Sequence, residues 1–142
     1  MFLTRLIYAS TIAENFGSST IEEILQVARV NNAKRNITGI LGFNSQYFLQ
    51  CLEGSRAKVN ETYKTILGDN RHSDIIMLDY SEINSREFSD WTMGYIPSSS
   101  ISAAINLKFS GSDNFDPYAM SGASAYNMLL ELKNSLAYAS NN

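Results

Sequence analysis

The order of hydrophobic patterns along the first 97 residues is the feature that most constrains this chain. Strand-like patterns occur at residues 4–10, 37–43, 46–53, 75–83 and 91–96, and helical spacing separates the first from the second and the third from the fourth. Each helix can cross over and bring its flanking strands side by side. We therefore expect an α+β, ferredoxin-like βαββαββ sheet with both helices on one face.

The two helical segments also carry the usual end signals. In the first, Ser19 and Glu22 fit a capping box, and the apolar stripe continues to about Asn31. In the second, Ser55 is a candidate N-cap, and Gly68 follows the last turn. Both segments are therefore predicted to be amphipathic helices with one apolar face each.

The tail from residue 98 carries weaker helical patterns, first at residues 102–109 and again after Pro117. Apolar side chains recur through the second of these, among them Met128, Leu129, Leu132 and Leu136. We expect residues 98–142 to form a C-terminal helical extension that packs on the other face of the sheet. Residues 1–97 would then form the domain itself.

Composition excludes several classes of protein. Of 142 residues, 44% are hydrophobic and 18% charged, which argues against a disordered chain, and the net charge of −3 argues against a nucleic-acid partner. There is no signal peptide pattern and no apolar run near the ~20 residues of a membrane span. One cysteine, Cys51, and one histidine, His72, offer no disulfide and no metal site. We expect a cytoplasmic protein without metal, nucleic acid or membrane.

Three polar residues do not fit an ordinary core. Gln50 shares a strand face with Phe48 and Leu52, Tyr8 has a hydroxyl that needs a partner when buried, and Asn32 follows the end of the first helix. Buried polar groups without partners cost roughly 1–3 kcal/mol each. A satisfied core glutamine, a bonded tyrosine and an asparagine cap would each be unremarkable. Together the three can surround a polar, planar ligand.

Other residues near these three extend the candidate site. Apolar residues of the two helices would form the walls of a slot: Ile24, Ala28 and Ile66. Arg71 and His72 follow the second helix and can reach a phosphate or a carbonyl, or form a solvated pair in a loop. Trp91 and Met93 lie on one face of the last predicted strand, where aromatic residues and methionine are usually part of the core.

Short segments with a specific joint spacing cover about the first 97 residues. They are RLIYAS at 5–10, NN at 31–32, ITGIL at 37–41, FLQCLEG at 48–54, VNETYKTIL at 59–67, RH at 71–72 and WTM at 91–93. With Tyr8, Asn32, Gln50 and Met93 at this spacing, the chain resembles BLUF domains, the flavin-binding blue-light sensors. The tail, with LKFSG at 107–111, is similar to that of short PixD-type stand-alone BLUF photoreceptors.

The resemblance implies a cofactor and a place for it. FAD would be held non-covalently between the two helices. By similarity, Asn32 and Gln50 hydrogen-bond the polar edge of the isoalloxazine. Asn31, Arg71 and His72 would face the edge of the cofactor or its phosphates.

The resemblance also implies a light response. Blue light would drive electron and proton transfer from Tyr8 to the flavin through Gln50, whose amide rearranges by rotation or tautomerisation. The signal would leave through the strand that carries Trp91 and Met93. In PixD-type proteins a basic residue often stands where this chain has Thr65, which leaves Lys64 or Arg71 as candidates to anchor the flavin C2 carbonyl.

Other functions compete with this reading. A flavin-free ferredoxin-like interaction module would use Gln50 and Tyr8 only as core residues. An acylphosphatase-like hydrolase needs an arginine-bearing loop after the first strand, and residues 9–13 offer none. A light-oxygen-voltage sensor needs a cysteine motif that is absent, and Cys51 faces away from Gln50. The expected photoreceptor is not an enzyme, so its output would pass to a homo-oligomer or to a response-regulator-like protein partner.

Overall fold

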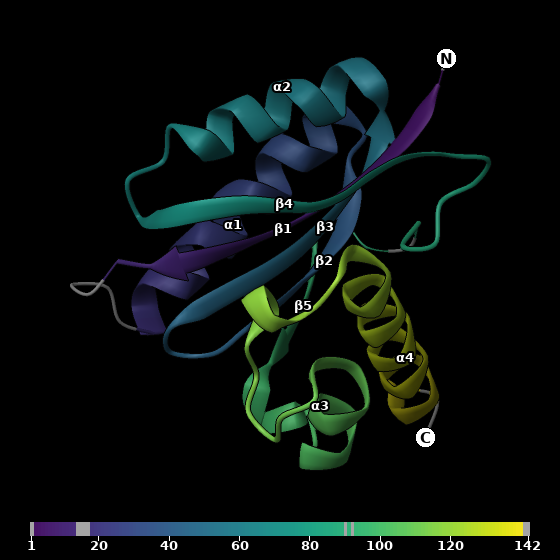
Figure 1. Ribbon diagram of the computed structural model, residues 1–142. Coiled ribbons are helices and arrows are strands. Elements are labelled where there is room, and N and C mark those ends of the chain that lie inside the picture. Colours follow the sequence, from purple (N-terminus) through teal and green to yellow (C-terminus); the bar gives the residue numbers. More distant parts are fainter. Residues whose placement is uncertain (1, 14–17, 90, 92, 141–142) are drawn as a thin grey trace.

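The computed structural model describes residues 2–13, 18–89, 91 and 93–140, with the backbone alone for residues 18–20 and 136–140 (Figure 1). The elements, in chain order, are β1 (Leu3–Ile12), α1 (Ser18–Arg35), β2 (Thr38–Phe43), β3 (Tyr47–Ser55), α2 (Arg56–Leu67), β4 (His72–Ile83), β5 (Gly94–Pro97), α3 (Ala103–Ser110) and α4 (Gly122–Ser140). Short 3₁₀ turns at Ser98–Ser100 and Pro117–Ala119 flank α3.

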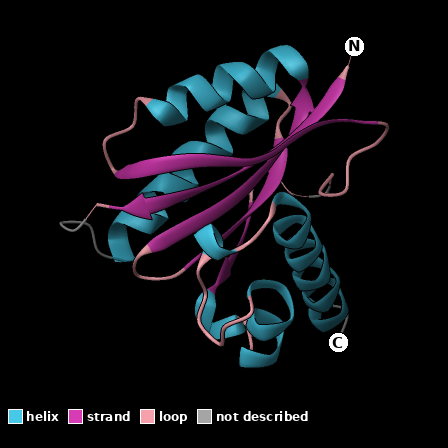
Figure 2. Cartoon of the chain, in the orientation of Figure 1, coloured by secondary structure: helices cyan, strands magenta, loops and turns pink. Residues whose placement is uncertain are grey.

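The five strands form one mixed sheet in the order β4-β1-β3-β2-β5, with α1 and α2 on one face (Figures 1 and 2). All neighbouring strands are antiparallel except β2 and β5, which are parallel. The predicted α+β, ferredoxin-like architecture is confirmed. The expectation that each helix brings its flanking strands side by side is wrong, because β3 lies between β1 and β2, and β1 lies between β3 and β4. Each helix therefore crosses over two strand positions.

The register of the central strands determines which residues lie beside Gln50. Gln50 on β3 pairs with Tyr8 on β1 and with Leu41 on β2, so it lies in the middle of the sheet. The pairing of β1 with β4, an outer strand, shifts register twice, between Ile7 and Tyr8 and between Ala9 and Thr11. Asp74 in β4 has a left-handed backbone with φ of 51°.

Alternation along the strands divides the core between two faces of the sheet. The face toward α1 and α2 buries Leu6, Tyr8, Leu41, Phe48, Leu52 and Met93. The opposite face buries Ile7, Leu49 and Cys51 with Met128, Leu129 and Leu132 of α4. Residues of α4 thus pack on the second face, which also carries Cys51 and is the face opposite Gln50. The boundary between residues 97 and 98 stays a prediction.

The helix ends differ in part from expectation. Helix α1 continues to Arg35, so the prediction that Asn32 follows its end is wrong. The residues Ala33 to Arg35 are good helix formers, and the helix stops where Asn36 adopts a φ of 55°. Helix α2 is capped as predicted, because the Ser55 hydroxyl accepts from the Lys58 N–H at 3.4 Å. The predicted capping box at Ser19 lies outside the described side chains.

The last strand begins later than its pattern predicts. Strand β5 starts at Gly94, so Trp91 and Met93 lie in the connection before it. The Trp91 carbonyl accepts from the Gly39 N–H at 3.0 Å, and the Trp91 ring lies against Gly94, where an added Cβ would be 2.7 Å from it. The expectation that Trp91 and Met93 share one face is wrong: Trp91 packs with the α4 side of the sheet and Met93 with the α1 and α2 side.

Candidate functional site

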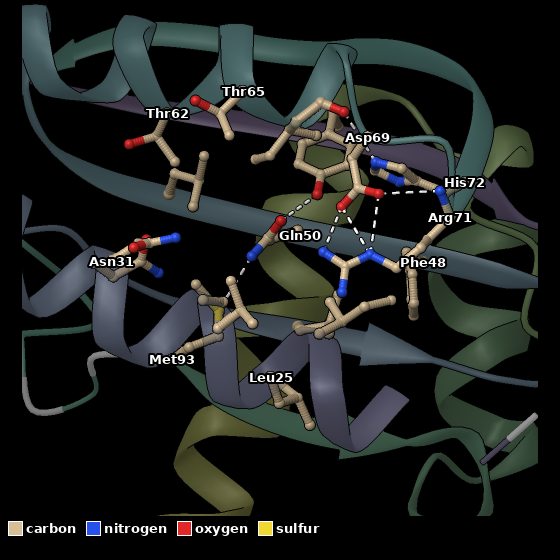
Figure 3. Close-up of a pocket in the computed structure, with 18 of the residues that line it drawn as sticks. Leu25, Asn31, Phe48, Gln50, Thr62, Thr65, Asp69, Arg71, His72 and Met93 are labelled. Atoms are coloured by element: carbon tan, nitrogen blue, oxygen red, sulfur yellow. Dashed lines mark hydrogen bonds and ion pairs between the residues drawn. The ribbon is translucent and has the colours of Figure 1, made fainter. Parts of the chain in front are cut away.

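A cavity lies between α1, α2 and the face of the sheet that carries Gln50 (Figure 3). It holds about 720 Å³ of space free of protein atoms, including the part at its mouth that is open to solvent. Ten residues proposed from the sequence line it: Tyr8, Ile24, Ala28, Asn31, Asn32, Gln50, Ile66, Arg71, His72 and Met93. Trp91 lies instead against Phe88 on the other side of the sheet.

Tyr8 and Gln50 form a buried hydrogen-bonded pair on the floor of the cavity. The Tyr8 hydroxyl donates to Gln50 Oε1, which the β1–β3 register places opposite it. Tyr8 is 3% exposed and Gln50 6%. Burial raises the pKa of Tyr8 well above its usual range, and the nearby Tyr63 and Asp69 raise it further. Tyr8 is therefore a neutral phenol whose proton points at the amide oxygen.

The other end of the Gln50 amide contacts Met93. Gln50 Nε2 donates to Met93 Sδ at 3.3 Å (Figure 3). The Met93 carbonyl accepts from Arg29 Nε of α1 at 3.2 Å, which fixes the backbone beside the cavity. Tyr8, Gln50 and Met93 thus form a chain of contacts in which one amide has an acceptor bond at one end and a donor bond at the other. Met93, rather than Trp91, lies beside Gln50.

Charged residues at the mouth of the cavity are paired with each other. The Arg71 guanidinium donates to both carboxylate oxygens of Asp69, at 2.6 to 3.0 Å. These bonds lower the pKa of Asp69. His72 Nε2 lies 3.1 Å from the Ile66 carbonyl, so this nitrogen carries the hydrogen, and Nδ1 can accept from the Ser10 hydroxyl at 2.8 Å. Burial lowers the pKa of His72 and favours the neutral ring.

The donor set fits a flavin. The apolar side chains of Ile24, Ala28 and Ile66 flank the space between the helices, where a flat ring would be sandwiched. The amides of Asn31, Asn32 and Gln50 each offer both a donor and an acceptor, which matches a ring edge that alternates carbonyl oxygens with ring nitrogens. Pockets of this kind combine apolar walls with a few convergent polar groups.

Sequence reasoning missed several residues of the site. Asp69, Arg35 and Thr62 line the cavity, and the sequence alone singles out none of the three. The spacing of Asp69 and Arg71 in the turn after α2 is a signal that could have suggested their pairing. Of the two candidates to replace a basic residue at Thr65, Arg71 lines the cavity and Lys64 is exposed on α2.

Neither metal binding nor membrane insertion finds support in the described part of the chain. No group of three or more His, Cys, Asp or Glu residues could hold a metal ion there. No helix among the described residues is long and apolar enough to cross a membrane.

Comparison with known proteins gives consistent matches. The model of the BLUF family, described as "Sensors of blue-light using FAD", matches residues 3–94. The Escherichia coli "Blue light- and temperature-regulated antirepressor BluF" is 41% identical over 81 residues, which are 56% of this chain and 20% of that protein. The chain therefore spans about a fifth of the length of this relative.

Two solved structures match over most of both chains. BlrB, a BLUF protein in its dark state, has a TM-score of 0.80 at 29% identity, and the match covers 94% of this chain and 96% of that one. BlsA in its photo-activated state has a TM-score of 0.82 at 29% identity, covering 92% and 94%. The likeness thus includes the helical tail as well as the sheet.

Proposed function

Because the chain belongs to the BLUF family of blue-light sensors that use FAD, we propose that Tyr8, Gln50 and Met93 are the switch of its light response. The predicted family, its sensor function and its FAD cofactor are confirmed by the match. Residues 3–94 are accordingly a sensor domain and not an enzyme. The chain of contacts from Tyr8 through Gln50 to Met93 is the observation that carries the proposal.

The residues around the cavity have distinct tasks in this proposal. Asn31, Asn32 and Gln50 hydrogen-bond the polar edge of the flavin ring, while Ile24, Ala28 and Ile66 enclose its faces. Arg71 and His72 bound the cavity at its mouth, where each is already held by a partner in the chain. When bound, FAD absorbs blue light and supplies an excited state that is a strong oxidant.

The hydrogen bonds of this chain determine how the switch works. Loss of an electron makes the Tyr8 phenol strongly acidic, and its proton is already directed at Gln50 Oε1. The amide of Gln50 then exchanges its donor and acceptor positions, either by rotation or by tautomerisation. Either change alters the bond from Gln50 Nε2 to Met93 Sδ. The response therefore reaches the connection before β5 through Met93. Trp91 lies in the same connection and contributes to the response through its packing on the other side of the sheet.

The proposed output is a change in protein contacts. The relative BluF is named an antirepressor, a role exercised on another protein, which supports a protein partner here as well. We infer a homo-oligomer, or a complex with a response-regulator-like protein, whose affinity differs between dark and light. A cytoplasmic location, consistent with the single cysteine, belongs to the same proposal. Light scattering after gel filtration, in dark and light, measures the subunit number and its change.

An absorption spectrum before and after blue light tests the proposed switch. We expect a yellow protein whose flavin band moves to the red, and FAD on chromatography after denaturation. Gln50→Leu should abolish the shift while FAD stays bound, whereas Gln46→Leu, at an exposed position in the turn before β3, should leave the shift unchanged. A normal shift in Gln50→Leu would refute the switch. A protein that takes up no FAD would contradict the use of the cavity.

A further inference from the structure

Glu53 is a buried carboxylate that the proposed switch does not use. It lies on β3, three residues after Gln50, and is 0% exposed. Glutamate is almost never fully buried unless it is paired. Its Oε2 accepts from Arg5 of β1, at 3.0 Å from Nε and 2.9 Å from the terminal nitrogen. This accounts for one carboxylate oxygen.

The second oxygen of Glu53 holds the connection between β4 and β5. Oε1 accepts from the backbone N–H groups of Glu87 at 2.9 Å and Phe88 at 2.8 Å. The main-chain carbonyl of Glu53 accepts from Arg86 at 2.8 Å. Side chain and main chain of one strand residue therefore bind three consecutive residues of the connection.

The same connection carries Met93 to the cavity. The Phe88 ring is 1% exposed and stacks on Trp91 at 6.4 Å, and the Phe88 carbonyl accepts from the Trp91 N–H at 3.2 Å. Two residues beyond Trp91, Met93 Sδ contacts Gln50. The connection is thus attached to β3 at two points, Glu53 and Gln50, and the stacked rings of Phe88 and Trp91 lie between them along the chain.

Helix α4 contacts Arg5 and Glu87, which both donate to the Glu53 carboxylate. The Arg5 guanidinium lies 4.1 Å from the centre of the Tyr126 ring. Lys133 Nζ donates to the Glu87 carbonyl at 2.5 Å and lies 3.5 Å from the Glu87 carboxylate. Figure 1 shows α4 on the face of the sheet opposite α1 and α2. A displacement of the connection therefore changes contacts made by this helix.

We propose that Glu53 is a positioning residue of the light response. With Arg5, Glu87, Phe88 and Lys133 it forms a polar clasp that holds Met93 against Gln50 and joins the connection to α4. The proposal rests on the proposed function, because it assumes that Met93 follows the Gln50 amide. In the resting state the clasp presents Met93 Sδ as an acceptor. When Gln50 changes, the clasp passes the displacement to Lys133.

The variant Glu53→Gln tests the first half of the clasp in the FAD-loaded protein. Glutamine keeps the volume but loses the charge that binds Arg5. We expect the red shift to form, the return to the dark spectrum to slow at least threefold, and the ¹³C-methyl NMR signal of Met93 to move. The slower return follows from a weaker acceptor for Gln50 Nε2. The matched control Glu82→Gln removes the exposed ion pair to Arg56 and should match the unmodified chain in both readouts.

Variants of Lys133 test the link between the clasp and α4. They also keep the proposal testable if Glu53→Gln does not fold. We expect Lys133→Gln to keep the red shift but to lose most of the light–dark difference in amide hydrogen exchange within α4. Lys133→Arg should restore that difference. Unchanged dark return and an unchanged Met93 signal in Glu53→Gln, or an unchanged α4 difference in Lys133→Gln, would overturn the proposal. Absence of any red shift in the unmodified chain would instead overturn the proposed function.

Discussion

The hydrogen bond between Tyr8 and Gln50 should be measurable as a coupling energy in a double-mutant cycle. Tyr8→Phe removes the donor and leaves Gln50 Oε1 buried without it, and Gln50→Leu leaves the Tyr8 hydroxyl without its acceptor. Each single change should lower the free energy of unfolding by about 1–3 kcal/mol, the cost of an unsatisfied buried group. The double variant has neither group, so its loss should be well below the sum of the two.

Urea unfolding at a fixed excess of FAD, followed by far-ultraviolet circular dichroism, measures all four proteins. We expect a coupling energy of roughly 0.5–3 kcal/mol, the range for residues in direct contact. The variant Tyr80→Phe is the control, because the Tyr80 hydroxyl accepts from Asn60 at an exposed site. This change should alter the free energy of unfolding by no more than about 0.5 kcal/mol. The same variants of Tyr8 and Gln50 should lack the light-induced red shift.

Additive effects of Tyr8→Phe and Gln50→Leu, within about 0.3–0.5 kcal/mol, would refute the reasoning. Such a result would mean that the two side chains do not satisfy each other in solution. The proton path assigned to them would then lose its structural basis, whatever the spectra of the single variants.

Three further outcomes follow from the geometry. Gly39→Ala would place a Cβ 1.9 Å from the Cys51 carbonyl oxygen and should cost about 3 kcal/mol or more in urea unfolding, while Gly42→Ala, whose Cβ meets nothing closer than 3.7 Å, should cost far less. Burial lowers the pKa of His72 in the folded chain. In the unfolded chain His72 binds a proton near the ordinary histidine pKa of about 6.5, a pH at which the folded chain leaves the ring neutral. Stability should therefore fall as the pH drops through this region, and His72→Gln should reduce that fall between pH 7.5 and 5.5. Asn32→Leu should weaken FAD binding about tenfold in a fluorescence titration, the loss expected for one good hydrogen bond of about 1.4 kcal/mol.

Much of the fold could be predicted because local patterns determine it. The alternation of β3, the Ser55 cap and the stop at Gly68 each act over a few residues, and each lies where expected. Neighbour relations in the sheet could not be predicted in this way. Alternation along a strand determines which face a side chain takes but not which strand lies beside it. The sequence therefore did not predict that each helix connects strands that lie two positions apart in the sheet.

The errors near Trp91 and Asn32 have different origins. The pattern at residues 91–96 resembles a strand. In the structure, however, the Trp91 carbonyl accepts from the Gly39 N–H, and the Trp91 ring packs on the α4 side of the sheet. Asn32 resembles a cap because asparagine is common at helix ends, but the good helix formers from Ala33 to Arg35 continue α1 to Arg35. The role of Glu53 was invisible for a further reason: its partners lie 48, 34 and 35 residues away along the chain.

The outer strands of the sheet limit how copies of this chain can meet. A long, flat outer strand is a template to which a strand of another molecule can add. In β4 two register shifts, the left-handed Asp74 and the exposed carboxylate of Glu82 oppose such addition. On the other side β5 has only four residues and ends at Pro97, which has no N–H to donate. These features oppose the addition of a further strand at both outer strands, and we expect the proposed homo-oligomer to assemble through the helices and loops.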